Sequence, residues 1–259
     1  MSYETLLVEV SDNVALITIN RPDKRNALNA AVRRELLAAL DQLRTDDNAR
    51  VIILTGAGDK AFIAGADIAE FADRTPVQQR AVMAERRIFD EVADYPKPVI
   101  AMINGFALGG GCELALACDV RVGGKSAKFG QPEIRLGIIP GGGGTQRLPR
   151  LIGSGNAMRL ILTGELIPAD EAVRIGLIDV LVDDADLRTR TFEIARSMAA
   201  HSPLTLRLAK TAIRAAEEMP LGAGLAFERE MFITAFGSND KREGVAAFLE
   251  KRSANFTGA

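Results

Sequence analysis

The chain of 259 residues contains no tryptophan, two tyrosines, two cysteines and one histidine. A serine–histidine–aspartate triad or a histidine-rich metal site would have to be built around His201, which lies beside Ser202 and Pro203 at an expected helix boundary. Cys112 and Cys118 are too few for a disulfide scaffold, and they lack the second pair or the histidines of a zinc site. We therefore expect no metal site, an exposed His201 and two reduced, buried thiols.

The chain also lacks an excess of charge of either sign. Lys and Arg number 32 and Asp and Glu number 34, which gives a formal net charge of -2, and the charges are scattered along the chain. Binding to a nucleic acid or to an anionic membrane requires a clustered basic surface, so neither partner is expected. No apolar run is long enough to cross a bilayer, and residues 1–10 do not read as a secretion signal. These features predict a cytoplasmic protein.

The apolar patterning predicts an α/β core followed by a helical C-terminal region. Short apolar segments predict strands at Leu6–Val10, Val14–Asn20, Val51–Leu54, Pro98–Ile103, near Val120, near Phe129 and at Asp179–Val182. Helical spacing predicts helices at 29–45 with Asn29 as the cap, 76–93, 110–117, 143–152, 156–162, 169–175, 187–200, 203–216, 221–236 and 241–251. We expect residues 1–200 to form the core and residues 201–259 to form the helical region.

Three consecutive glycines, Gly109–Gly111, begin an expected helix, although glycine costs about 1 kcal/mol relative to alanine inside a helix. Free amides at a helix N-terminus suit an oxyanion, and close packing of the helix against a strand is the alternative explanation. The second glycine run, Gly141–Gly144, lacks the Gly-Lys-Ser/Thr ending of a phosphate-binding loop. No Gly-x-Gly-x-x-Gly motif opens a helix after a strand, so neither nucleotide triphosphate hydrolysis nor dinucleotide binding is supported.

Two glutamates are the leading candidates for proton transfer, because the single histidine is set aside. Glu113 follows Gly109–Gly111 on an apolar helix, and Glu133 follows Pro132 in a segment with little charge. Most glutamates are surface charges, whereas two carboxyl groups beside exposed backbone amides can act as an acid/base pair.

Five segments together resemble the enoyl-CoA hydratase (crotonase) family over nearly the whole chain. They are Arg21–Asn29, Phe62–Asp67, Asn104–Ala115, Phe129–Glu133 and Gly137–Arg147. The resemblance implies a crotonase-type spiral of ββα units, assembled as a homotrimer or a dimer of trimers through the helical C-terminal region. It also implies an acyl-CoA substrate and no cofactor, because CoA is part of the substrate.

The resemblance further assigns roles to individual residues. The backbone amides of Ala66 and Gly110 would hold the thioester oxygen, and Glu113 and Glu133 would form the acid/base pair. The residues expected along the CoA moiety are Arg25, Ala27, Leu28, Ala64, Asp67, Ile68 and Gly141, with Phe248 and Lys251 reaching the CoA of a neighbouring subunit. The segment 71–89 is expected to form the floor of the acyl pocket.

These assignments predict addition of water across the 2,3 double bond of a 2-enoyl-CoA to give 3-hydroxyacyl-CoA. Glu113 would orient and activate the water, and Glu133 would deliver the proton to the α-carbon. An enoyl-CoA isomerase is the nearest alternative, since the same glutamates would support a proton shuttle. A non-catalytic scaffold or RNA-binding member is the second alternative, against which the balanced charge and the intact glutamate pair argue.

Overall fold

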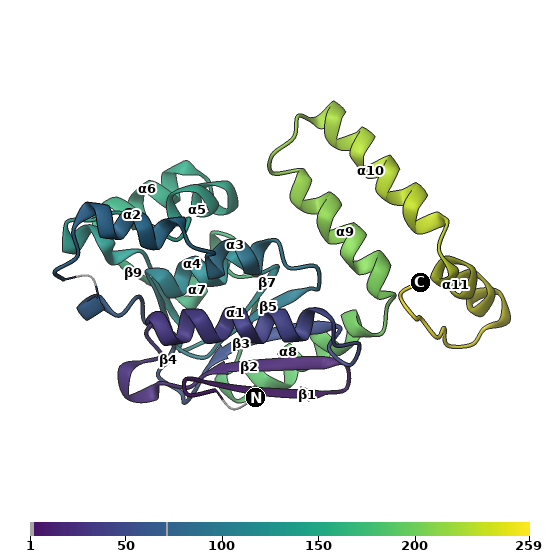
Figure 1. The fold of residues 1–259 in the computed structure, drawn as a ribbon, viewed down its shortest axis with the longest axis horizontal. Helices are drawn as coiled ribbons and strands as arrows, with labels where there is room; N and C mark the ends of the chain where they lie inside the picture. The colour runs from purple at the N-terminus through teal and green to yellow at the C-terminus, as the bar shows by residue number, and fades with distance from the viewer. Residues whose placement is uncertain (1–2, 71) are drawn as a thin grey trace.

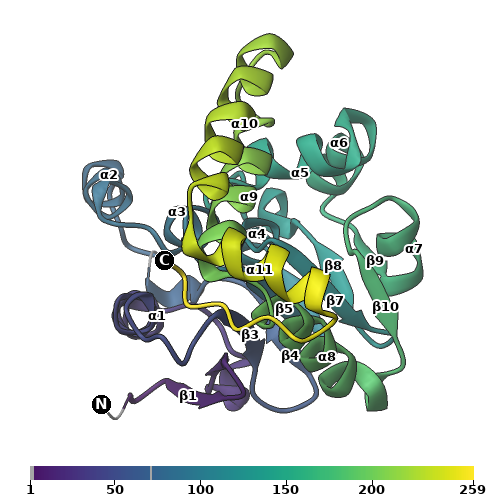
Figure 2. The ribbon, with the colours of Figure 1, turned by 90° about the vertical axis from the view of Figure 1, so that its right-hand side faces the viewer.

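The structure is a computed structural model that describes residues 3–70 and 72–259, and its strands form two sheets (Figures 1 and 2). The larger sheet has the order β1-β2-β3-β5-β7-β10 and consists of β1 (Leu6–Ser11), β2 (Val14–Ile19), β3 (Val51–Gly56), β5 (Val99–Ile103), β7 (Val120–Gly124) and β10 (Val180–Val182). The smaller sheet has the order β4-β6-β8-β9 and consists of β4 (Ala61–Ile63), β6 (Phe106–Leu108), β8 (Lys128–Gly130) and β9 (Leu166–Pro168).

From β3 to β8, consecutive strands alternate between the two sheets, which makes the core a spiral. β3, β5 and β7 are parallel neighbours in the larger sheet, and β4, β6 and β8 are parallel neighbours in the smaller one. Each turn of the chain therefore adds one strand to each sheet and then continues into a helix. This is the predicted repeat of ββα units. The first two predicted strands form a hairpin, since β1 and β2 pair antiparallel with Leu6 opposite Ile19.

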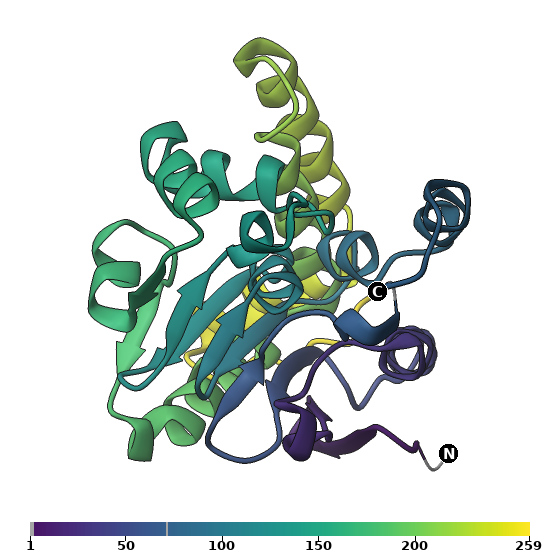
Figure 3. The same ribbon diagram turned by 90° about the vertical axis from the view of Figure 1, so that its left-hand side faces the viewer.

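Helices cover both faces of the larger sheet (Figure 3). α8 (Leu187–Ala199) packs on one face, where Phe192 joins a cluster with Leu16 and Ile53. On the other face, the cluster that contains Ile17 and Leu54 includes buried residues of α1 (Ala30–Arg44), α3 (Ile88–Ala93) and α4 (Gly110–Ala117). Strands covered on both faces are apolar at every position, which is why the short runs were recognisable in the sequence.

The remaining helices lie beyond these layers. They are α2 (Pro76–Ala84), α5 (Gly144–Ile152), α6 (Ser154–Thr163), α7 (Ala169–Arg174), α9 (Pro203–Ala215), α10 (Leu221–Phe236) and α11 (Asn239–Glu250), with short 3-10 helices η1 (Pro22–Lys24), η2 (Ile68–Glu70), η3 (Pro132–Leu136) and η4 (Asp184–Asp186). Asn29 caps α1 as predicted, because its side chain accepts a hydrogen bond from the amide of Val32. Within the described ranges, no helix combines the length and the apolar character needed to cross a bilayer.

The predicted continuous helix over residues 76–93 is wrong, because the chain breaks between α2 and α3. Glu85 is extended, with φ -70° and ψ 164°. The two arginines that follow turn in different directions: Arg86 pairs with Asp41 of α1, and Arg87 donates a hydrogen bond to the carbonyl of Gly141. These tertiary contacts override the local helical spacing. The three-residue strands β4, β6 and β9 were not predicted either.

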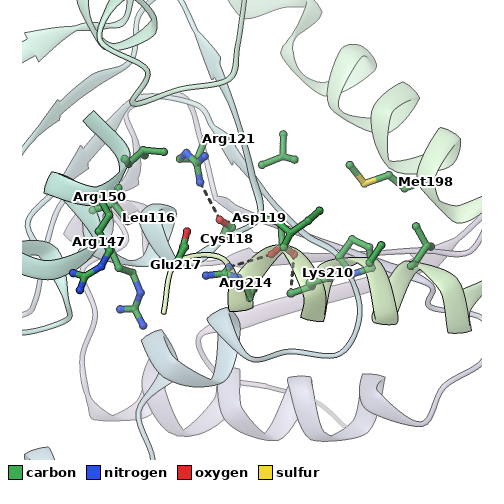
Figure 4. A pocket seen from close by; sticks show the side chains of 16 residues that line it. Leu116, Cys118, Asp119, Arg121, Arg147, Arg150, Met198, Lys210, Arg214 and Glu217 are labelled. Carbon is green, nitrogen blue, oxygen red and sulfur yellow. Dashed lines mark hydrogen bonds and ion pairs between the residues drawn. The ribbon is translucent and has the colours of Figure 1, made fainter. Parts of the chain in front are cut away.

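The C-terminal helices α9 and α10 form an arm that projects from the core (Figures 1 and 2). The C-terminal half of α9 is held against the core by Asp119, whose carboxylate pairs with Lys210 at 2.7 Å and with Arg214 at 3.0 Å (Figure 4). These groups line a cavity of about 380 Å³ between α9 and the core. After α11 the chain returns, and Arg50 donates a hydrogen bond to the carbonyl of Phe256. The predicted division into residues 1–200 and 201–259 stays a prediction.

Candidate active site

Two segments far apart in the sequence place the amides of Ala66 and Gly110 side by side. An isolated β-bridge joins Leu28 to the segment around Ala66. Leu28 N donates to Gly65 O, and Asp67 N donates to Leu28 O, each at 2.9 Å. The amide of Ala66 takes no part in this bridge. Gly110 is the first residue of α4, so its amide has no acceptor within the helix. A Cβ atom built on Gly110 would lie 3.6 Å from Ala66 N. Among the described residues neither amide has a protein acceptor, so together they form a potential oxyanion site.

The glycine run at the start of α4 serves both purposes considered for it. A Cβ on Gly111 would lie 2.0 Å from the carbonyl oxygen of Ile63, so this position packs directly against the backbone of β4. Gly109 has φ +50°, a conformation that other residues rarely adopt, and a Cβ there would lie 2.8 Å from Oε1 of Glu133. Close packing and an accessible amide at Gly110 therefore coexist in one short segment.

Glu113 lies three residues after Gly110 and is buried, with 3% of its surface exposed. Its Oε1 atom accepts hydrogen bonds from the amides of Gly142 at 2.6 Å and Gly144 at 2.8 Å, the second of which is the first residue of α5. Burial raises the pKa of Glu113, while these two hydrogen bonds and the charges of Arg87 and Arg147 oppose the increase. One carboxylate oxygen is thus held firmly, which orients the other.

Glu133 is in η3 and approaches the same region from the other side of Gly109. Burial raises the pKa of Glu133 to about 7, and the negative charge of Glu113 contributes to the increase. With its amide nitrogen turned toward Glu133, the buried Gln131 side chain donates to both carboxylate oxygens at 3.2 Å. A carboxyl group that titrates near neutrality can act as an acid or as a base.

A cavity of about 750 Å³ extends from the two amides and Glu113 toward α1 and α2. Apolar side chains that line it include Leu37 of α1, Met83 of α2 and Phe89 of α3. Charged side chains, including those of Asp41 and Arg86, line it as well. Val82, Met83 and Phe89 belong to the segment 71–89, which was predicted to form the floor of the acyl pocket; Phe71 itself lies outside the described residues. The cavity therefore joins the backbone amides to a space that is lined by both apolar and charged side chains.

Most residues predicted to bind the CoA moiety form two adjoining segments, and Gly141 lines the cavity. The turn that contains Arg25, Ala27 and Leu28 contacts the segment from Ala64 to Ile68, since Ala64 N donates to Arg25 O at 3.1 Å. Asp67 pairs with Arg21 at 3.1 Å, and Ile68 is half-exposed. Their roles in binding stay predictions.

Phe248 and Lys251 lie at the C-terminal end of α11, which Figure 1 shows on the opposite side of the molecule from α2. The side chain of Phe248 is exposed. The structure of one chain does not bring these two residues to the site. Their predicted contact with a neighbouring subunit therefore stays a prediction, as does the absence of a metal or cofactor.

The residues set aside in the sequence lie where expected. His201 is exposed, and both cysteines are free and buried. Burial raises the pKa of Cys112 to about 12, so its thiol stays protonated and unreactive near neutral pH. Several residues of the site were given no role by the sequence prediction. Gly142 and Gly144, whose amides bind Glu113, belong to a recognised segment. Gln131 also lies in a recognised motif. Arg87 lies in the segment that was wrongly predicted as a continuous helix, and nothing in the sequence around it indicated a role in the site.

A ββα spiral in which the amide at the start of a helix adjoins a second backbone amide, with two carboxyl groups nearby, is the architecture of a crotonase-type site. The chain matches the family model described as enoyl-CoA hydratase/isomerase over residues 9–259. It is 42% identical over 253 residues to the short-chain-enoyl-CoA hydratase of Clostridium acetobutylicum, with 97% of both chains covered. It is 43% identical over 257 residues to the crotonyl-CoA hydratase of Syntrophomonas wolfei, with 99% of both chains covered.

Among solved structures, the enoyl-CoA hydratase of Bacillus anthracis superposes with a TM-score of 0.94 at 43% identity, covering 99% of this chain and 100% of that chain. The chain belongs to the enoyl-CoA hydratase/isomerase family. The predicted family, enzyme class and fold are therefore confirmed.

Replacing Glu133 by glutamine tests the burial of its charge without reference to activity. The pKa of Glu133 is raised from 4.5 to about 7, so the folded protein binds this proton more tightly than the unfolded chain. Ionised Glu133 therefore lowers stability above pH 7, and this effect disappears as the pH falls to 4.5. We expect Glu133→Gln to raise Tm above pH 7 and to have a much smaller effect near pH 4.5. An increase in Tm of equal size at both pH values would contradict the raised pKa of Glu133. The control variant is Glu193→Gln on α8.

Proposed function

We propose that the protein adds water across the 2,3 double bond of 2-enoyl-CoA thioesters to give 3-hydroxyacyl-CoA. One observation carries the proposal: the free amides of Ala66 and Gly110 lie beside each other, and Glu113 follows on the same helix. The adjoining cavity has room for an acyl chain, and the relatives are named for hydration of short-chain substrates. CoA enters as part of the substrate, so the chemistry requires only residues of this chain.

The amides supply the electrophilic part of the reaction. When water adds to the β-carbon, negative charge moves onto the thioester oxygen, and two N–H groups that already face this position stabilise the charge without reorganising. The amide of Gly110 also carries the partial positive charge of the α4 N-terminus. Removal of one such donor costs about 3 kcal/mol in the transition state, by comparison with other oxyanion sites.

The glutamates supply the proton transfers. Oε1 of Glu113 is occupied by two amides, which leaves Oε2 to accept a proton from the attacking water. Glu133, with a pKa of about 7, is partly protonated at neutral pH and gives its proton to the α-carbon. Their mutual repulsion favours one proton on the pair. After hydration Glu113 carries the proton taken from water and Glu133 is ionised, so a proton returns to Glu133 and leaves Glu113 before the next cycle.

Hydration of crotonyl-CoA, followed by the loss of absorbance of the conjugated thioester, tests the function. We expect Glu113→Gln and Glu133→Gln each to reduce kcat about 10²- to 10⁴-fold, because each removes a positioned acid or base. The absence of hydration by the wild-type protein with short, medium and long enoyl chains would refute the proposal. Incubation of a 3-enoyl-CoA in isotopically labelled water separates the isomerase alternative, since only a hydratase incorporates oxygen.

Gly110→Pro deletes one donor while leaving the helix able to form. Proline is well tolerated at the first residue of a helix, and the Cβ position of Gly110 has no protein atom closer than 3.4 Å. We expect kcat to fall about 10²- to 10³-fold with Tm little changed. Ser154→Pro, at the first residue of α6, is the matched control. Equal activity of the two proline variants would exclude the amide of Gly110 from the reaction.

We also propose a homotrimeric assembly through the arm. α10 has no buried residue in the single chain, although it carries Leu221, Phe232 and Phe236, which are more than half exposed. An apolar helix of this kind needs a covering surface, and the family resemblance assigns this surface to other copies of the chain.

Sedimentation should give the mass of three chains, or of six for a dimer of trimers. Phe232→Glu should lower the mass, whereas Val77→Glu on α2 should not; a monomeric wild-type protein would refute the assembly.

A further inference from the structure

The loop Gly141–Gly144, here called the glycine loop, is held from both sides of its backbone. Its amides at Gly142 and Gly144 donate to Oε1 of Glu113. Its carbonyl groups face the opposite way, where Nη2 of Arg87 donates to Gly141 O at 2.7 Å and Nη1 of Arg147 donates to Gly142 O at 3.0 Å. Two arginines therefore contact consecutive carbonyls of the loop that binds Glu113.

The contact of Arg87 is the more direct of the two. The carbonyl of Gly141 and the amide of Gly142 belong to the same peptide group, which is planar. A guanidinium that fixes the oxygen at one end therefore fixes the direction of the N–H bond at the other end, and this N–H bond points at Glu113. Because glycine flanks this peptide on both sides, no side chain of the loop resists rotation of its plane. Arg87 and Glu113 are thus connected through a single peptide group.

Arg87 is itself held in place. Its Nε atom lies 3.6 Å from Oδ2 of Asp90, and its guanidinium carbon lies 5.7 Å from the centre of the Phe89 ring. The other oxygen of Asp90 pairs with Nη2 of Arg147 at 3.1 Å. One carboxylate therefore spaces the two arginines so that each reaches its carbonyl in the glycine loop.

We propose that Arg87 is a positioning residue for hydration, which acts by fixing the peptide plane between Gly141 and Gly142 and through it the carboxylate of Glu113. This inference rests on the proposed function. The connected hydrogen bonds also polarise the peptide group, which strengthens the bond from Gly142 N to Glu113. The charged groups around Glu113 are Arg87 and Asp90 from the α2–α3 side, Arg147 from α5 and Glu133 from η3.

The test compares Arg87→Met, which keeps an apolar stem, with Arg87→Lys, which keeps a charge and a donor. Loss of a charge-assisted hydrogen bond that holds the base predicts a fall in kcat of about 10- to 100-fold for Arg87→Met, with KM for crotonyl-CoA little changed. Removal of the positive charge raises the pKa of Glu113, so the acidic limb of the kcat profile should move to higher pH. Arg87→Lys should restore most of kcat and return the acidic limb toward the wild-type position.

Asp90→Asn is a second variant that predicts the opposite sign. The Asp90 side chain is 53% exposed, so its replacement is compatible with folding, and loss of its negative charge should move the acidic limb to lower pH. The control is Arg190→Met on α8, an arginine paired with Glu193 on the other face of the larger sheet. It should leave kcat and the pH profile unchanged.

The outcomes separate this inference from the function on which it rests. If the wild-type protein does not hydrate crotonyl-CoA or longer enoyl-CoAs, the proposed function fails. If the wild-type protein hydrates and Arg87→Met has the wild-type kcat and acidic limb, or changes only KM, the positioning role alone is refuted. A second set of results also refutes the positioning role. In it, Arg87→Met lowers kcat, Arg87→Lys does not restore it, and the acidic limb shifts in neither Arg87→Met nor Asp90→Asn.

Discussion

The capture of a buried carboxylate by backbone amides is the interaction on which the site depends. Glu113 sits in an apolar helix, where an ionised carboxyl group without partners would be strongly destabilising. The amides of Gly142 and Gly144 make its burial tolerable, and they require a loop whose backbone approaches closely. A Cβ on Gly142 would lie 2.6 Å from Oε2 of Glu113, so glycine at position 142 is a consequence of this buried carboxylate.

The spiral determines how the two carboxyl groups meet. α4 follows β6 and η3 follows β8, and these two strands are hydrogen-bonded parallel neighbours. Glu113 and Glu133 are therefore attached to adjacent strands, whose separation in any sheet is about 4.8 Å. Their electrostatic coupling, which contributes to the raised pKa of Glu133, follows from the pairing of the smaller sheet.

The sequence predicted the features whose causes are local. Strands covered on both faces are apolar throughout, Asn29 is a recognisable cap, and three glycines at the start of a helix signal exposed amides. The motifs then led to Glu113 and Glu133, whose roles await kinetic measurement. What escaped prediction depends on distant partners: the break between α2 and α3 exists because Arg86 and Arg87 reach Asp41 and Gly141. Strands of three residues are too short to show an alternating pattern: β4, β6 and β9 were missed, whereas β8 and β10, which are equally short, lie in segments that were recognised.

Within residues 3–70 and 72–259, the amides of Ala66 and Gly110 have no protein acceptor, which has a consequence for solvent exchange. Most amides of the paired strands around them are protected by hydrogen bonds, and such amides exchange their protons only when the structure opens. The two free amides stand apart from this pattern, since no protein hydrogen bond must break before they exchange. Protection at these two positions alone would report that an oxygen atom occupies the site, whether or not any reaction follows.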